Sequence, residues 1–170
     1  MAVPHITSFC WCMGLEAGSR LIGFIHLIIS FLLMVVCSIY AENFRAYVGT
    51  VEDAGDRIYS TWYAITCAVA VLSVVHVLLA LTLLFAVYKR NTTALRVWVW
   101  LMCALFTASF VYVIVSMTFG FSVSGSDIFI AFLEGALFFG LIAYCILCVN
   151  SYYLMLKSSE DMEGPHKTDY

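Results

Sequence analysis

The chain has 170 residues, of which 64% are hydrophobic and only 11% are charged, with a formal net charge of −3 at pH 7. Soluble domains carry about 25% charged residues, so this chain lacks the polar groups to cover a surface in water, and most of its surface must face lipid. The small, dispersed net charge gives no indication of a nucleic-acid partner. The length accommodates one compact domain, which we expect to be an all-α membrane protein.

Residues 1–20 form a predicted cytoplasmic head, whose Cys10-Trp11-Cys12 motif leaves three interpretations open: a metal site, half of a disulfide framework or a site of lipid attachment. A cytosolic position disfavours a disulfide, and two thiols with His5 provide too few ligands for a metal. Juxtamembrane cysteines are common sites of S-acylation. We therefore predict palmitoylation of Cys10 and Cys12. The alternative is that they are unmodified thiols beside Trp11, which anchors at the headgroup level.

Four apolar runs are long enough to cross a bilayer, which takes about 20 helical residues. They cover residues 21–40, 63–88, 95–117 and 128–156. Unsatisfied backbone amides are costly in hydrocarbon, so each run must be helical. The first run is internal and too long for the core of a cleavable signal peptide. The sequence therefore predicts a four-helix transmembrane bundle with short loops.

The basic residues predict that both termini are cytoplasmic. In that orientation only Arg45 and Arg57 lie outside, whereas six basic residues lie inside, as the positive-inside rule requires. The six are Arg20, Lys89, Arg90, Arg96, Lys157 and Lys167. The turn YKRNTTALR, residues 88–96, is the strongest single marker of the inner side.

The segments between and after the spans are short. The first outer loop, residues 41–62, is acidic, and the second, residues 118–127, is a Gly/Ser-containing turn. The tail, residues 157–170, is polar and is expected to be disordered. Its end places Thr168 two positions before the terminal Tyr170, which makes it a candidate PDZ ligand.

Three ionisable residues fall inside the predicted hydrocarbon: His26, His76 and Glu134. Such residues are rare in membranes and are functional candidates by default. Helix rise places them in steps on the order of 6 Å, a spacing that suits a proton or cation relay. The alternative is that they make interhelical hydrogen bonds. We favour the alternative, because a conducting path needs more polar lining than these helices offer.

The remaining cysteines lie within the spans. Cys145 and Cys148 form a C-x-x-C motif in an apolar helix, where two small packing residues are the expected meaning. Cys37 and Cys67 lie near the outer ends of the first two spans, so a bridge between them stays open. Small residues four apart suggest close helix contacts, more simply within the bundle than in a dimer. They are Ala104 and Ala108 in the third span, and Ala131, Gly135, Ala136 and Gly140 in the fourth.

The C-x-C head before GLEAGSRLIGFIHLIISFLL, the four spans, the small outer loops and the polar tail resemble small arthropod tetraspan proteins of the Pasiflora type. The resemblance covers most of the chain as architecture, and the residues only in the head and first span. It implies membership of the septate-junction core complex, which forms the paracellular barrier of insect epithelia and glia, including a blood–brain barrier. The implied place is the lateral plasma membrane at cell–cell contacts.

Two other tetraspan families are alternatives to this resemblance. Claudins share the tetraspan plan, but their outer-loop tryptophan and cysteine pair is absent here. Lysosomal tetraspans of the LAPTM kind carry Pro-x-Tyr motifs in the tail, whereas the only tail proline here is Pro165. No enzyme motif and no cofactor motif is present. We expect a structural junction protein that contacts lipid, other junctional membrane proteins, and a PDZ scaffold or copies of itself. The alternative is an endolysosomal or plasma-membrane transporter that uses the His/Glu residues.

Overall fold

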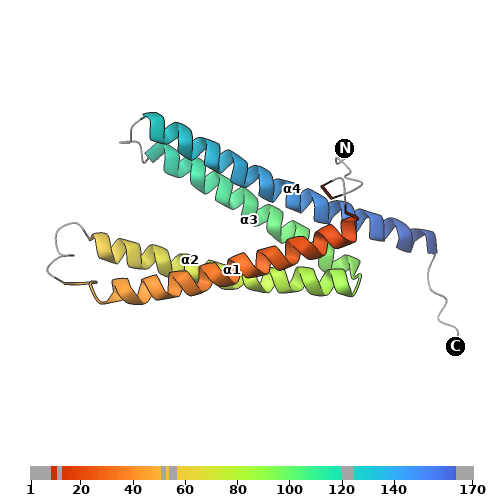
Figure 1. The fold of residues 1–170 in the computed structure, drawn as a ribbon, viewed down its shortest axis with the longest axis horizontal. Coiled ribbons are helices and arrows are strands. Elements are labelled where there is room, and N and C mark those ends of the chain that lie inside the picture. The colour runs from red at the N-terminus through yellow and green to blue at the C-terminus, as the bar shows by residue number, and fades with distance from the viewer. Residues whose placement is uncertain (1–8, 11–12, 51–52, 54–56, 120–124, 164–170) are drawn as a thin grey trace. The chain divides into compact units, whose positions relative to one another are not determined.

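The computed structural model describes residues 9–10, 13–50, 53, 57–119 and 125–163, and of residues 116–119, 125–134 and 163 it describes the backbone only. The described residues form four helices, each with a stretch long and apolar enough to cross a membrane. They are α1 (Leu15–Arg45), α2 (Ile58–Tyr88), α3 (Thr92–Phe119) and α4 (Gly125–Glu163) (Figure 1). This confirms the predicted all-α class with four transmembrane helices.

All four helices begin before their predicted spans, and three of them end later. Once a helix has formed, each added residue gains a hydrogen bond, so polar flanks extend an apolar run. The clearest correction concerns the tail, because residues 157–163 continue α4 instead of being disordered. The hydroxyl of Ser159 donates to the carbonyl of Leu156 at 2.7 Å within this extension. The sequence then reaches Gly164 and Pro165, which disfavour helix. The tail from residue 164 onward, with its PDZ-ligand candidates, lies outside the described residues.

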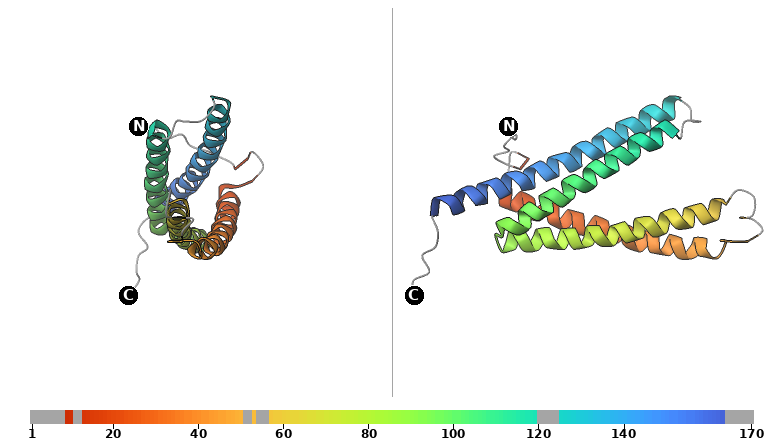
Figure 2. Two further views of the ribbon diagram at one scale, coloured as in Figure 1. Left: turned by 90° about the vertical axis from the view of Figure 1, so that its left-hand side faces the viewer. Right: turned by 180° about the vertical axis from the view of Figure 1, so that it is seen from behind.

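The chain forms two compact units. One, Leu21–Phe85, holds most of α1 and α2. The other combines Met1–Arg20 with Ala86–Tyr170, and so holds the first turns of α1, the end of α2, and all of α3 and α4. Within the units α1 lies beside α2 and α3 beside α4 (Figure 2).

A glycine allows the close approach of α1 to α2. A Cβ atom added at Gly23 would lie 2.7 Å from Cδ2 of Leu84. At Gly135 or Gly140 on α4, in contrast, an added Cβ would meet no atom of the described residues within 4 Å. The close helix contact that we predicted around the small residues of the fourth span is therefore not made by Gly135 or Gly140 with any described residue. Aromatic rings pack between α3 and α4 instead. Phe139 packs edge-on at 5.5 Å between ring centroids against two rings of α3.

The fully buried side chains of the second unit lie toward the predicted cytoplasmic ends of its helices. They include Leu95 and Trp98 on α3, and Cys148, Val149 and Tyr152 on α4. Many large apolar side chains elsewhere on the helices are exposed, among them Trp100, Tyr112 and Leu137 in this unit, which suits a surface in contact with lipid. Among the side chains that the structure describes, those packed most tightly in this unit therefore lie toward these ends.

The turn between α2 and α3 is tight because each helix is capped by backbone or side chain. The N–H of Asn91 donates to the carbonyl of Ala86 at 2.9 Å, and the N–H of Arg90 donates to that of Val87 at 3.3 Å. These are the two bonds of a Schellman cap, with Arg90 in the left-handed position at φ 49°. The side-chain oxygen of Asn91 then accepts from the N–H of Ala94 at 3.1 Å and starts α3.

One carboxylate organises the described part of the outer loop between α1 and α2. Asp53 accepts hydrogen bonds from the N–H of Gly49 and the N–H of Ser60, each at 3.2 Å, and from the Ser60 hydroxyl. Ser60 is in the first turn of α2, where backbone N–H groups have no partner inside the helix. Asp53 therefore joins Gly49, in the turn that follows α1, to the start of α2.

Candidate functional site

Two of the predicted intramembrane residues are in contact. The rings of His26 on α1 and His76 on α2 are 5.5 Å apart between centroids and meet at 79°. Nδ1 of His76 lies 3.0 Å from the carbonyl oxygen of Leu72. A carbonyl only accepts, so Nδ1 carries a proton and donates a hydrogen bond to this carbonyl. The two imidazole rings are therefore in edge-on contact inside the predicted spans.

The other members of the predicted relay and tail are not described. Glu134 lies on α4 among the residues whose side chains are outside the description, and Cys12, Thr168 and Tyr170 are outside it entirely. The structure therefore brings His26 to His76 and leaves the third step of the relay a prediction. Among the described residues, no group of three or more His, Cys, Asp and Glu side chains could hold a metal.

The described part of the head is docked on α4. Phe9 and Met13 form a β-bridge, and between them Cys10 donates its backbone N–H to the hydroxyl of Tyr144 at 3.0 Å. That hydroxyl lies 3.9 Å from Sγ of Cys10, and the rings of Phe9 and Tyr144 are 5.7 Å apart. Phe9 also fills the space over Gly18, where an added Cβ would lie 2.6 Å from the Phe9 side chain.

All six described cysteines are free thiols. The bridge left open between Cys37 and Cys67 is therefore absent from the structure. Cys148 is buried and Cys145 half-buried, which fits two small packing residues on α4. Cys10 is exposed, as a candidate for acylation must be, and its palmitoylation stays a prediction.

A charged cluster that the sequence did not reveal lies in the second unit. The Glu16 carboxylate accepts from Arg20, one turn along α1, and from Nη2 of Arg90 in the α2–α3 turn at 3.0 Å. The Arg20 guanidinium also stands 4.9 Å from the centroid of the Tyr88 ring, in a cation–π contact. We call Glu16, Arg20 and Arg90 the clasp, because they tie the start of α1 to the turn between α2 and α3.

Several buried polar atoms of the same unit have no hydrogen-bond partner among the described residues. They are the hydroxyls of Ser19 and Tyr152, Nε of Arg20 and Nε1 of Trp98. Each can donate a hydrogen bond, and the two nitrogens can only donate. Among the residues that the structure describes in this unit, these donors therefore have no acceptor.

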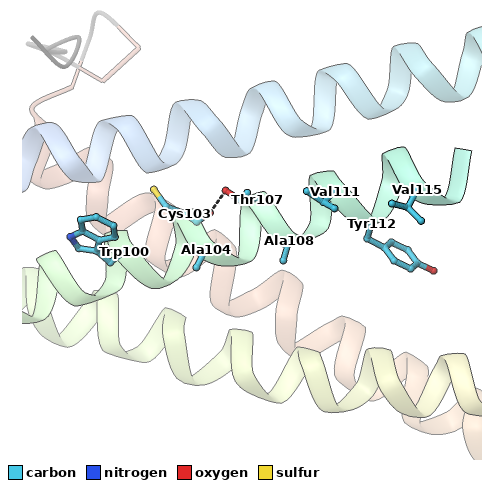
Figure 3. A pocket seen from close by; sticks show the side chains of 8 residues that line it. All are labelled: Trp100, Cys103, Ala104, Thr107, Ala108, Val111, Tyr112 and Val115. Carbon is cyan, nitrogen blue, oxygen red and sulfur yellow. Dashed lines mark hydrogen bonds between the residues drawn. The ribbon is translucent and has the colours of Figure 1, made fainter. Parts of the chain in front are cut away.

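An open apolar groove of about 820 Å³ runs along α3. Figure 3 shows its side chains, with Trp100 toward one end and Tyr112 toward the other, and Ala104 and Ala108 between them. The Thr107 hydroxyl in the groove donates to the carbonyl of Cys103 at 2.8 Å, so it needs no further partner. Ala104 and Ala108 are exposed within their own unit, so they do not make a close contact with the described side chains of α4.

Sequence reasoning missed the clasp, the Asp53 cap and the contact of the head with Tyr144. The four-residue spacing of Glu16 and Arg20 could have indicated an ion pair on one helix face. The Arg90 contact spans 74 residues and Cys10–Tyr144 spans 134, and no local pattern encodes either.

Comparison of the chain with protein-family models, with curated proteins and with solved structures finds no match in any of the three. The resemblance to septate-junction tetraspans therefore stays a prediction.

Proposed function

We propose that the chain is a structural and interaction protein of cell–cell junctions of the septate type. It supports junction assembly and the paracellular barrier of epithelia or glia at the lateral plasma membrane. The observation that carries this proposal is the α3 groove, which offers a surface of small residues on a helix that faces lipid.

The chemistry of the groove suits another transmembrane helix. Lipid tails are as apolar as leucine, so helices in a membrane associate through close packing and hydrogen bonds rather than through the hydrophobic effect. Ala104 and Ala108 let a second backbone approach, and Trp100 and Tyr112 add contact area at the ends. We assign this place to a helix of another junctional membrane protein.

Filling the groove tests the proposal. Ala108→Leu should lower co-purification with junctional membrane proteins and lower transepithelial resistance at an unchanged surface level, because the groove is open and the larger side chain is tolerated in lipid. Ala136→Leu makes the same change at an exposed position of α4 outside the groove and should alter neither quantity. A groove variant with intact partners and an intact barrier contradicts the proposal. An image showing endolysosomes instead of lateral membrane contradicts the location.

Contact between His26 and His76 favours a second candidate, an ion-handling protein of the endolysosome or plasma membrane. Glu134→Gln keeps the shape and hydrogen bonding of the side chain and removes only its charge. If the protein transports protons or cations, this variant and His76→Ala should reach the membrane but lose function. If it is structural, Glu134→Gln should keep folding, surface delivery and barrier nearly intact.

A further inference from the structure

Arg90 occupies a backbone conformation that suits another residue better. Its φ of 49° at the C-terminal cap of α2 is left-handed, and glycine fits that position without strain. A non-glycine residue in this conformation is strained, and strained residues in proteins cluster at functional sites. One use is the bond to Glu16. The Arg90 side chain nevertheless remains 66% exposed, so much of its guanidinium is open to a second partner.

Positive charge is in excess around the clasp. Arg20 shares the same carboxylate and is itself 41% exposed. Two guanidinium groups against one carboxylate leave a net charge of +1, and the exposed Lys89 and Arg96 add two further positive charges. The surface therefore attracts anions.

Several buried polar groups at the same place have no hydrogen-bond partner among the described residues. Tyr152 is fully buried on α4, yet close enough to Glu16, Arg20 and Arg90 to interact electrostatically with each of them. The Tyr152 hydroxyl, the Ser19 hydroxyl and Nε of Arg20 have no partner among the described residues. Buried polar groups in proteins are normally paired. A group that brings several acceptor oxygens to the clasp would pair with the donors that have no partner among the described residues.

We propose that Arg20 and Arg90 bind the phosphate of an anionic lipid headgroup. The planar fork of a guanidinium matches two phosphate oxygens at once, and Tyr88 holds that of Arg20 in place. The clasp lies at the ends of membrane-spanning helices, on the predicted cytoplasmic side, where basic residues meet anionic lipids. The acyl chains of a lipid bound there continue along the apolar helix surface.

Native mass spectrometry of the full chain in detergent tests this by counting retained lipids. Phosphatidic acid and a phosphatidylinositol bisphosphate should be retained about tenfold better than phosphatidylcholine. Inorganic phosphate and inositol trisphosphate, which have no acyl chains, should compete only weakly. If they bind as tightly as the lipids, the site recognises free phosphate compounds and the assignment to a lipid is wrong.

Three variants distinguish specific binding at the clasp from general attraction of anionic lipid to positive charge. Arg90→Gly relieves the left-handed strain while removing the guanidinium, so it should keep the melting temperature and lower anionic-lipid retention about tenfold. Arg96→Gln removes one positive charge from an exposed position outside the clasp and should lower it by less than about twofold. Glu16→Gln removes the competing carboxylate and should raise it.

If Arg90→Gly and Arg96→Gln lower the retention of anionic lipid equally, the proposal is overturned, because the lipid is then attracted by positive charge in general. Lower retention of anionic lipid in Glu16→Gln also overturns the proposal, because the clasp then has only a structural role. If Arg90→Gly lowers the melting temperature, Arg20→Lys replaces it as the test, since it keeps the charge and loses the fork. Unchanged retention in Arg20→Lys would then contradict a guanidinium site.

Discussion

At the scale of the residue, Asp53 shows how one carboxylate can order a loop. The Ser60 hydroxyl donates to it, and the amides of Gly49 and Ser60 add to the effect, so the pKa of Asp53 is held below its ordinary value of 3.8. A pKa lower in the folded state than in the unfolded one means that the ionised form stabilises the fold. This stabilisation is present at pH above the ordinary value and is lost as pH falls through the lowered one.

The first prediction follows from that sign. In NMR spectra of the protein in micelles, the amide signals of Gly49 and Ser60 should titrate with a midpoint below pH 3.8. Asp53→Asn keeps an acceptor oxygen but carries no charge, so both signals should then be independent of pH in this range. A wild-type midpoint at or above 3.8 would mean that the hydrogen bonds do not hold the carboxylate.

The second prediction concerns the head. If Cys10 and Cys12 are palmitoylated, acyl-exchange mass-tagging of the wild type should give a hydroxylamine-dependent label, and Cys10→Ser with Cys12→Ser should remove it. The exposed thiol of Cys10 agrees with access by an acyl-transfer enzyme. Absence of the label from the wild type would show that these are plain thiols.

At the scale of the element, the head is held by a fit between a ring and a glycine. Phe9 lies over Gly18 on α1 and beside Tyr144 on α4, so it joins two helices that are far apart in sequence. Gly14, one turn before Gly18, has no atom of the described residues within 4 Å of an added Cβ. Gly14 therefore offers a nearby control for substitution at Gly18, although it lies before the first residue of α1.

The third prediction uses that pair. Gly18→Ala should push Phe9 from its place, loosen the head and raise the rate of maleimide labelling at Cys10. Gly14→Ala, at the residue before the start of α1, should leave that rate unchanged, because an added Cβ there meets no atom of the described residues within 4 Å. Equal rates in both variants would show that the fit over Gly18 does not hold the head. The measurement should be made with the other cysteines followed separately by mass spectrometry.

At the scale of the whole molecule, the fourth prediction is the orientation of the helices. The excess of basic residues in the head, the α2–α3 turn and the tail predicts that both termini are cytoplasmic. A C-terminal tag should therefore stain only after the cells are permeabilised, and a tag in the loop after Arg45 should stain without detergent. The reverse pattern would place the clasp at the outer leaflet and expose Cys10 to an oxidising space.

Apolar runs predicted the four helices. A membrane-spanning segment must form all its backbone hydrogen bonds internally, so it is recognisable from its length and hydropathy. Their ends were predicted less well. The polar residues 157–163 look like a tail in composition, but they extend α4 because a long helix already precedes them. The turn YKRN, in contrast, was recognisable as a boundary, although its Schellman cap was not.

The amino-acid sequence by itself determined that this is an all-α protein with four helices able to cross a membrane, and it singled out His26 and His76 as exceptional. Only the tertiary structure decided that these two rings meet, that the head binds Tyr144, and that Glu16 joins Arg20 to Arg90. The physical reason is the distance along the sequence between the residues that come into contact. Hydropathy is summed along contiguous residues, whereas these contacts depend on the packing of segments between 50 and 134 positions apart, which no local pattern specifies.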